Sequence, residues 1–558
     1  MKLEDFSLRI VYEKDGAEVV TEDGDSVVSV EKEIADGRLT VVLRSDRPVR
    51  LRSARMVQPR EYSPEERFFG GGYQSWTRTL EYGPKDRQRG LLGPSRLPVA
   101  RTFSAASGDY AFVNYGRKLF HSHGYTYIRR GDRTELFGSL DESTGFTVFY
   151  ADMKENVFAV VKDVEGAEFS GEYRLFDILH AEGGYDEVFD SYFAAYPVKA
   201  PRRQIKRLAG YTSWYNYYQK IDEKIILRDL ESMYKTAGNA ANIFQIDDGY
   251  ESKVGDWLIV DREKFPGGMK AMADAIHNRG YLAGLWLAPF AAQRDSDIVK
   301  KRPDWLVRGK NGKPLVAGVA WGGFYALDSE NKGVRDYLRG VFDTVFGKWG
   351  FDMVKLDFLY AACMEPRNGK SRGALMHDAM AFLRECVGDK LLLGCGVPMC
   401  SSFGFVDACR TGCDAELSFA DRYYVSCTNQ EIVSTRHSIE NTVFRRHLNG
   451  RVFLSDPDVF FLRDGGMKKT NYTDTQKALL AKVNKMLGSV LFVSDNVGMY
   501  DAEKRAMLLD AFAPFEGKVT GAEMTGKDTV NVYFEENGTE KTLSFDLSTG
   551  DTEVRADK

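Results

Sequence analysis

The chain has 558 residues, of which 43% are hydrophobic and 28% charged, and its formal net charge is −5. This length exceeds what one compact core holds, so we expect two or three domains in a soluble protein of ordinary composition. No basic block indicates a nucleic-acid partner, and no apolar run is long enough to cross a bilayer.

The N-terminus and the cysteines bear on the cellular compartment. The first residues, MKLEDFSLRIVYEKDG, are charged and lack the apolar core of a secretory signal peptide. The cysteines number seven, and most lie between Cys363 and Cys427. An odd number suits free thiols in a reducing compartment better than a disulfide framework. We therefore expect a cytoplasmic protein.

Residues 1–205 are dominated by short β-rich runs separated by Gly, Asp and Lys turns. Clear examples are 39–45, 110–116, 145–152 and 157–164, and one short helix is expected at 186–196. This pattern predicts a sheet-rich N-terminal domain, a large sandwich.

Strands and helices alternate through residues 206–512. Buried strands that alternate with amphipathic helices predict a parallel sheet, and about eight such units favour a closed (β/α)8 barrel. An open doubly wound sheet is the alternative, but no Gly-rich nucleotide turn follows the first strand. Residues 513–558 contain two strand-like runs in hairpin spacing, which predict a small antiparallel β domain.

Polar residues stand where the predicted barrel strands end. They are Asp247, Asp248, Lys355, Asp357, Arg410, Asp414, Asp456, Asp458 and Asp495, with Trp286 at the end of the third strand. So many carboxylates would be costly in a core, whereas barrel active sites are built from these strand ends. We therefore expect a site in the mouth of the barrel.

Two of these carboxylates suit complementary roles. Lys355 and Asp357 point to the same face of their strand, and the lysine favours an ionised nucleophile; a plain ion pair is the alternative. Asp414, in a short loop facing other carboxylates, is expected to have a raised pKa and to act as acid and base; a loop cap is the alternative. Such a pair, about 5–5.5 Å apart, is what retaining glycoside hydrolysis requires.

The residues typical of other catalytic mechanisms are not found at the predicted strand ends. None of the seven histidines stands at a recognisable strand end, and neither a GxSxG motif nor a P-loop is present. A zinc site at Cys395, Cys400, Cys409 and Cys413 has unusual spacing. A magnesium site at Asp247, Asp357 and Asp458 lacks the expected Glu at successive strand ends. We expect neither a metal nor a cofactor.

Several motifs occur in order along the chain. They are YTSWYNYY (211–218), FQIDDGYE (244–251), GLWLAPF (284–290), VKLDFLY (354–360), GCGVP (394–398), GFVDACRTGCD (404–414) and SDPDVFFLR (455–463). Together they resemble the α-galactosidases of glycoside hydrolase family 36, over the whole chain. The resemblance implies an N-terminal β-supersandwich, a central barrel and a C-terminal antiparallel β domain.

The resemblance also implies roles for individual residues. Asp357 matches the family's nucleophile and Asp414 its acid/base. Asp247 and Asp248 match the pair that holds the galactose hydroxyls, especially the axial 4-OH and the 6-OH. The other sugar contacts implied are Trp286, Lys355, Arg410, Trp214 and Tyr215, together with Trp76, which the N-terminal domain contributes to the pocket rim.

One departure from the family pattern concerns the acid/base loop. Many short members have Pro before the acid/base Asp, where this chain has Cys413, and small residues after it, where this chain has Glu416-Leu417. The loop lies near the sugar's 2-position, so α-N-acetylgalactosaminidase stays open as an alternative.

Further hypotheses are transfer instead of hydrolysis, and a non-catalytic sugar-binding protein. The expected partner is a small α-galactoside or α-galactosaminide. The natural aglycone and a homo-oligomeric state stay open.

Overall fold

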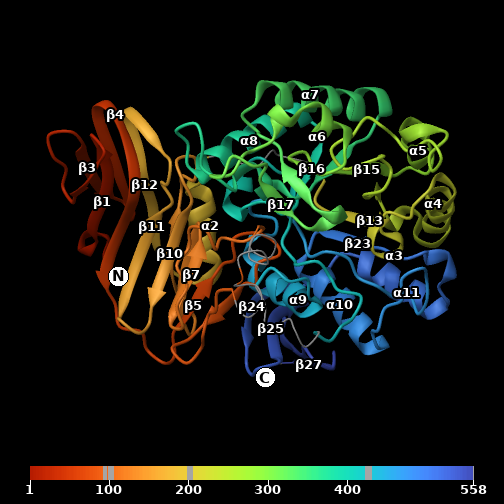
Figure 1. Cartoon of the computed structure of the whole chain (residues 1–558). Helices are drawn as coiled ribbons and strands as arrows, with labels where there is room; N and C mark the ends of the chain where they lie inside the picture. The colour runs from red at the N-terminus through yellow and green to blue at the C-terminus, as the bar shows by residue number, and fades with distance from the viewer. Residues whose placement is uncertain (92–96, 98–105, 198–204, 422–429, 557–558) are drawn as a thin grey trace.

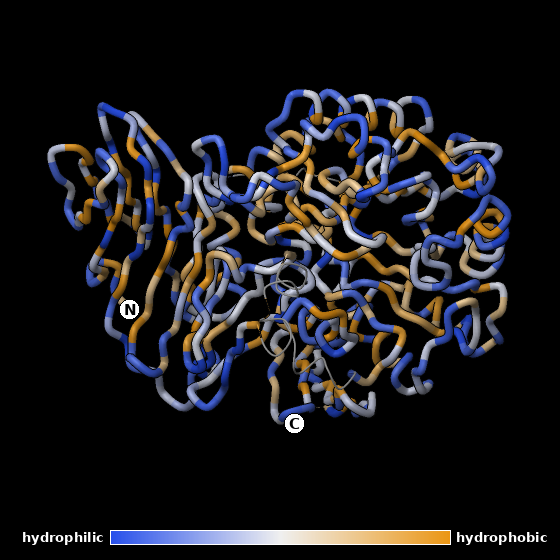
Figure 2. Tube along the Cα trace, in the orientation of Figure 1, coloured by the Kyte–Doolittle hydropathy of each residue, from blue (hydrophilic) through white to orange (hydrophobic). Residues whose placement is uncertain are grey.

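The computed structural model describes residues 1–91, 97, 106–197, 205–421 and 430–556. Figure 1 shows three assemblies: the N-terminal strands on the left, a barrel on the right, and a small sheet near the C-terminus below. Figure 2 shows the hydrophilic segments mainly along the outer edge of the molecule. None of the helices in the described ranges is long and apolar enough to span a membrane.

The N-terminal strands form one antiparallel sheet of 12 strands within the described residues. They are β1 (Ser7–Lys14), β2 (Ala17–Thr21), β3 (Ser29–Ala35), β4 (Arg38–Pro59), β5 (Arg67–Gly70), β6 (Leu80–Tyr82), β7 (Leu119–His123), β8 (Tyr125–Arg130), β9 (Arg133–Ser139), β10 (Thr147–Asp152), β11 (Val157–Lys162) and β12 (Glu168–Gly183). In β4, apolar side chains alternate with exposed ones, as expected for a strand with one buried face. The helix α2 (Tyr185–Ala195) follows, close to its predicted range.

One predicted strand is wrong. Residues 110–116 form a turn and a loop, in which the amides of Phe112 and Val113 bond to the carbonyl of Asp109. The aromatic side chains that suggested a strand have other partners: Tyr110 donates a hydrogen bond of 2.6 Å to Glu431. Alternating hydrophobicity here reflects tertiary packing of a loop.

The central domain is the predicted (β/α)8 barrel. Its strands are β13 (Leu208–Thr212), β14 (Ile243–Ile246), β15 (Leu282–Leu287), β19 (Met353–Leu356), β20 (Leu391–Gly394), β21 (Ala408–Arg410), β22 (Leu454–Asp456) and β23 (Val490–Val493). They pair in parallel in the order β22-β21-β20-β19-β15-β14-β13-β23. The sheet closes between β22 and β23, where Ser489 N bonds to Ser455 O at 2.9 Å and Phe460 N to Phe492 O at 3.1 Å.

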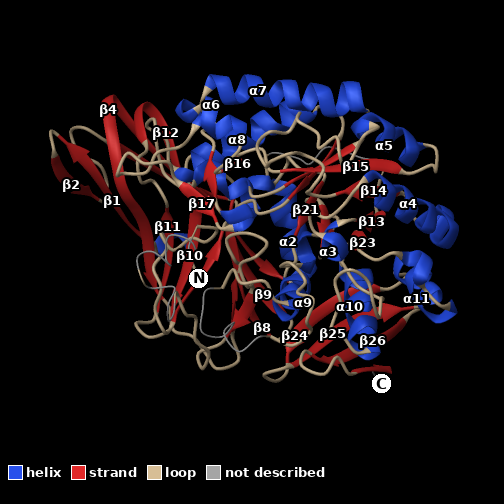
Figure 3. Ribbon diagram, turned by 45° about the vertical axis from the view of Figure 1, so that its right-hand side comes forward, coloured by secondary structure: helices blue, strands red, loops and turns tan. Residues whose placement is uncertain are grey.

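Helices cover the outside of the barrel, as Figure 3 shows. They are α4 (Glu223–Ala237), α5 (Gly268–His277), α7 (Lys332–Phe342), α8 (Arg372–Val387), α9 (Thr435–Phe444), α10 (Asp474–Leu487) and α11 (Ala502–Phe512). α4 illustrates why they form. Asp222 caps its first turn by accepting from Ile225 N, and it buries Ile226, Leu230 and Met233, three or four residues apart, against the core.

Shorter elements complete the chain. α3 (Trp214–Tyr217) follows β13, and the connection after β15 holds α6 (Asp297–Lys301) and the small sheet of β16 (Ala291–Gln293), β17 (Val316–Gly318) and β18 (Phe324–Ala326). The C-terminal antiparallel sheet consists of β24 (Lys518–Met524), β25 (Thr529–Glu536), β26 (Thr539–Asp546) and β27 (Thr552–Ala556). The fold class is thus as expected, whereas the domain limits 1–205, 206–512 and 513–558 stay a prediction.

Candidate active site

Asp357 follows β19 directly and is almost buried. Its Oδ2 accepts a hydrogen bond of 3.1 Å from the indole nitrogen of Trp286, and its Oδ1 one of 2.8 Å from the amide of Phe358. The Nζ of Lys355, on the same face of the strand, lies 3.9 Å from Oδ2. A carboxylate with two donors and a cation nearby is held in one orientation.

Lys355 connects Asp357 with Asp247, which follows β14, two strands away from β19 in the barrel. Its Nζ lies 3.1 Å from Oδ2 of Asp247, which accepts a bond of 2.8 Å from Gln245 as well. Burial and the charge of Arg410 lower the pKa of Lys355, but the charges of Asp247, Asp357 and Cys395 together raise it above its ordinary value. Lys355 is therefore a permanent cation between two carboxylates.

Asp248 faces a different set of partners. It accepts hydrogen bonds of 2.7 Å from the indole of Trp321 and 3.0 Å from Gln219. Burial raises the pKa of Asp248. Burial, followed by the charge of Asp248, also raises the pKa of the neighbouring Glu251 well above its ordinary value. Burial and the charge of Asp248 therefore both disfavour the charged form of Glu251.

Asp414 lies beyond β21, with 27% of its side chain exposed. Its Oδ1 accepts hydrogen bonds of 2.6 Å from Arg410 Nη1 and 2.9 Å from the indole nitrogen of Trp76. Trp76 comes from the N-terminal part of the same chain, so the barrel does not complete this site by itself. Partial exposure lets Asp414 exchange protons with water.

Arg410 is surrounded by acidic groups. Besides Asp414, it lies 3.3 Å from Asp456 and 2.7 Å from Asp458. Asp458 also accepts hydrogen bonds of 2.5 Å from the hydroxyl of Tyr215 and 2.7 Å from the amide of Ala415. Burial raises the pKa of Asp458 to about 7, although Arg410 opposes this shift.

Aromatic rings connect the two carboxylates. The Trp76 and Phe358 ring centroids are 5.3 Å apart, those of Phe358 and Trp321 5.1 Å, and those of Trp321 and Trp286 5.9 Å. Trp76 donates to Asp414 and Trp286 to Asp357. The rings therefore form a continuous aromatic contact between the two carboxylates, and aromatic faces of this kind suit the apolar face of a pyranose.

Most of the predicted site residues come together. Asp247, Asp248, Trp286, Lys355, Asp357, Arg410, Asp414, Tyr215 and Trp76 are linked by the contacts above. Trp214 is different, because it begins α3 instead of ending the first strand. The centroid of its ring lies 4.9 Å from that of Tyr218, and the two rings are tilted. Asp495 is also outside the group, because it accepts from the amides of Leu462 and Arg463.

Sequence reasoning missed Trp321, Glu251 and Gln219. Trp321 lies in a short 3-10 turn, Ala320–Gly322, with a left-handed φ of 56°. The tryptophan beside two glycines was the available signal. Glu251 follows the Asp pair in the chain, and its burial as a partner of Asp248 could have been suspected from that motif alone.

Neither metal hypothesis finds a ligand cluster. In the ranges that the structure describes, groups of potential ligands lie close enough for an ion at Asp109, His121 and His123, and at Glu135, His180 and Glu182. Both groups belong to the N-terminal sheet region and include neither the four cysteines nor the three aspartates. Cys395, Cys400, Cys409 and Cys413 are buried free thiols, while Cys427 lies outside the described residues.

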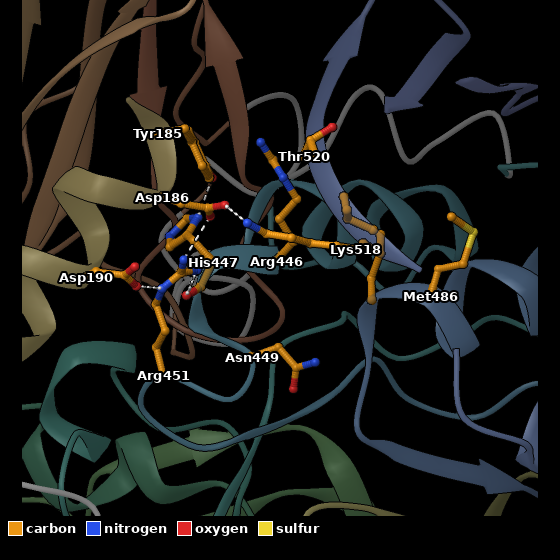
Figure 4. A pocket seen from close by; sticks show the side chains of 12 residues that line it. Tyr185, Asp186, Asp190, Arg446, His447, Asn449, Arg451, Met486, Lys518 and Thr520 are labelled. Carbon is orange, nitrogen blue, oxygen red and sulfur yellow. Dashed lines mark hydrogen bonds and ion pairs between the residues drawn. The ribbon is translucent and has the colours of Figure 1, made fainter. Parts of the chain in front are cut away.

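A cavity of about 450 Å³ lies away from these carboxylates, among α2, the end of α10 and β24 (Figure 4). Both of its carboxylates are paired: Arg451 lies 2.8 Å from Asp186 and 2.6 Å from Asp190, and Lys518 lies 3.3 Å from Asp186. The third cation, Arg446, lies over the ring of Tyr185 at 4.4 Å. None of the carboxylates of the barrel mouth lines this cavity.

The fold and the paired carboxylates define the class of protein, because a (β/α)8 barrel with two such groups at its strand ends is the architecture of a glycoside hydrolase. Comparison with known proteins agrees. The Melibiase family model matches residues 211–381. This match confirms the resemblance to the α-galactosidases of glycoside hydrolase family 36.

Individual relatives show how far the similarity extends. An α-galactosidase from Lactobacillus acidophilus is 30% identical over 48% of this chain and 35% of its own length. An A type blood α-D-galactosamine galactosaminidase from Flavonifractor plautii is 32% identical over 23% of this chain and 13% of its own. This chain therefore spans only a minor part of these two curated relatives.

A solved structure matches more completely. The α-galactosidase from Thermus thermophilus, in complex with p-nitrophenyl α-D-galactopyranoside, has a TM-score of 0.70 and 27% identity. The match covers 95% of this chain and 98% of that one. The whole fold described above, including the N-terminal sheet, is therefore shared with that structure.

Proposed function

We propose that this protein is a retaining exo-acting glycoside hydrolase that releases terminal α-linked galactose from a small-molecule substrate. One observation carries the proposal: Trp76 and Phe358, whose rings are in contact at 5.3 Å, each donate a hydrogen bond to one of the two carboxylates. Asp414 and Asp357 are thus bonded to two neighbouring residues whose rings touch.

The proposed reaction is a double displacement. The carboxylate of Asp357 attacks the anomeric carbon while Asp414 donates its proton to the leaving oxygen. This forms a covalent glycosyl-enzyme. Asp414 then takes a proton from water, the water attacks the anomeric carbon, and Asp357 leaves as a carboxylate. The cycle requires neither a metal nor a cofactor.

We assign binding of the sugar hydroxyls to Asp247 and Asp248. Asp247 and Asp248 are buried acceptors, and Trp321 and Gln219 orient Asp248. Acceptors fixed in this way suit hydroxyls such as the 4-OH and 6-OH of galactose, and a site built for a hydroxyl strongly rejects analogues that lack it. A cytoplasmic location, which we propose from the free cysteines of the described residues, would make the substrate an imported or internally formed galactoside.

The differing residues of the acid/base loop do not favour the acetamido sugar. The thiol of Cys413 is buried and donates to the carbonyl of Ile432 at 3.6 Å. Glu416 is fixed through its backbone, which bonds to Thr435 at 3.1 Å and to Tyr472 at 2.8 Å. The thiol of Cys413 is therefore engaged with the backbone, and galactose is the sugar that we propose.

Hydrolysis of 4-nitrophenyl α-galactoside and its α-N-acetylgalactosaminide, measured side by side from pH 4 to 8, tests this proposal. We expect turnover of the galactoside. Turnover of the α-N-acetylgalactosaminide alone would change the proposed specificity to that sugar and leave the proposed mechanism unchanged. If folded protein leaves both substrates intact but binds galactose, the non-catalytic hypothesis replaces the enzyme. Product analysis with sucrose present separates hydrolysis from transfer.

A further inference from the structure

Arg445, just after α9, is a buried arginine whose guanidinium contacts backbone carbonyls. Its Nη1 donates to the carbonyls of Thr411 at 2.7 Å and Ser75 at 3.2 Å, and its Nη2 to those of Gln74 at 2.9 Å and Thr77 at 3.0 Å. Burial lowers the pKa of Arg445 to about 10, so it stays positively charged at neutral pH.

Arg445 has no carboxylate among its ion-pair partners in the described part of the chain, although only 2% of it is exposed. A buried charge without an opposite charge is expensive, and an apolar side chain of similar volume would avoid that cost. The hydrogen bonds that Arg445 donates, and not its packing, therefore account for an arginine at this position.

These acceptors belong to two segments that meet at the site. Thr411 lies in the turn that leads from Arg410 to Asp414. Residues 72–77 form the loop that carries Trp76. The planar guanidinium of Arg445 has its donors in a fixed fork and bonds to both segments. A lysine ammonium could not make these bonds in the same geometry.

The preceding helix holds the same loop from its outer side. Asn441 donates to the carbonyl of Ser75 at 2.8 Å and accepts from the amide of Thr79 at 2.7 Å. Arg78 pairs with Glu440 at 2.7 Å. These bonds attach the loop to α9, whereas Arg445 adds the connection to the acid/base segment.

We propose that Arg445 is a positioning residue for proton transfer: it fixes the 72–77 loop so that the Trp76 indole meets Asp414. This inference rests on the proposed function of Asp414 as acid/base. Loss of the clamp lets Trp76 and Asp414 shift relative to each other. A misplacement of about 1 Å costs on the order of 100-fold in rate.

The test compares Arg445→Met with a matched control, Arg372→Met. Arg372, in α8, is also buried and also joins the barrel to the N-terminal part, through Asp163 at 3.1 Å and Glu165 at 2.8 Å. Its hydrogen-bond and ion-pair partners lie outside residues 72–77. A general weakening of domain contact should therefore affect both variants, whereas mispositioning of Asp414 should affect only Arg445→Met.

The readout is kcat/KM for two leaving groups. Methyl α-galactoside needs the proton from Asp414, whereas 2,4-dinitrophenyl α-galactoside does not. For Arg445→Met we expect a loss of about 100-fold on the methyl substrate and only a few-fold on the dinitrophenyl one. Arg372→Met should lose similar factors on both. Equal losses for Arg445→Met on the two substrates would overturn the proposal.

Two further variants keep the test decisive. If Arg445→Met does not fold, Arg445→Lys, which keeps the charge but lacks the fork, should show the same selectivity with a smaller loss. Adding Trp76→Phe to either variant should cause little further loss of kcat/KM on the methyl substrate relative to the dinitrophenyl one. Both changes act on the same hydrogen bond, between Trp76 and Asp414. Fully additive losses would show that Arg445 acts elsewhere.

Hydrogen exchange separates this inference from the proposed function. In Arg445→Met we expect faster deuterium uptake in a peptide covering residues 71–79 than in wild type or Arg372→Met. If wild type hydrolyses no galactoside but this difference appears, the proposed function fails while the clamp stands. Unchanged uptake in this peptide would refute the clamp.

Discussion

The indole nitrogen of Trp76 donates a hydrogen bond of 2.9 Å to Asp414, although 338 positions separate the two residues in the chain. The same oxygen, Oδ1, accepts from Arg410 at 2.6 Å. Because both bonds end on Oδ1, we expect the other oxygen, Oδ2, to carry the transferred proton. The N-terminal part of the chain thus helps to set the direction of proton transfer.

Replacement of Asp414 with Ala should affect substrates according to their leaving groups. A poor leaving group needs protonation, so kcat/KM for methyl α-galactoside should fall by about 10²- to 10⁴-fold. A dinitrophenyl leaving group departs without it, and its loss should be much smaller. Steady-state kinetics with both substrates checks this, with the exposed Asp297→Asn as a control. Equal losses would show that Asp414 is not the acid.

Asp357→Ala should abolish turnover of every substrate, by at least about 10⁴-fold, because no nucleophile remains. The space that the carboxylate leaves should admit a small anion. External azide should therefore restore part of the activity with an activated substrate and give the β-galactosyl azide, which NMR identifies. An Asp357→Ala variant with normal turnover would remove Asp357 from the mechanism.

The sequence predicted the barrel and most of the site for physical reasons. Alternation along a strand placed Lys355 and Asp357 on one face, and the carboxyl ends of parallel strands meet at one edge. Asp247, Asp414 and Asp458 could therefore be expected to meet. These relationships follow from local periodicity and the topology of a parallel sheet.

Contacts that depend on loops could not be derived in this way. The bonds of Trp321 to Asp248 and of Arg445 to the 72–77 loop join segments through tertiary packing, which no periodicity encodes. Trp214 was expected with Tyr215 at a strand end, but both lie in α3. Successive helical side chains point in different directions, so only Tyr215 reaches Asp458.

Lys355→Met should weaken both sugar binding and turnover. Lys355 lies 3.1 Å from Asp247 and 3.9 Å from Asp357, so its charge helps to hold both carboxylates in place. Without it, kcat/KM should fall by about 100-fold, with a lower kcat and a higher KM. Steady-state kinetics of both proteins measure this. A raised KM with an unchanged kcat would reduce Lys355 to a sugar contact.

Asp458→Asn should alter the pH dependence of stability. The pKa of Asp458 in the folded protein is about 7, above the value of about 3.9 in an unfolded chain. The folded state therefore binds more protons between these values, and its free energy of unfolding falls as pH rises from about 4 to 7, by up to about 4 kcal/mol. The variant should lose this contribution.

Thermal midpoints at pH 5 and pH 8 check the prediction for Asp458. The decline of the midpoint between these values should be smaller in Asp458→Asn than in wild type, even if the variant is less stable at pH 5. Asp297→Asn, at an exposed position, should keep the wild-type decline. The same decline in all three proteins would mean that Asp458 does not take up a proton on folding.

The most direct test of the proposed mechanism is the anomeric configuration of the first product. Proton NMR during rapid hydrolysis of 4-nitrophenyl α-galactoside distinguishes α- from β-galactose before mutarotation mixes them. Two displacements through Asp357 and Asp414 predict that α-galactose forms first. If β-galactose forms first, the reaction is a single displacement by water, and Asp357 is not a covalent nucleophile.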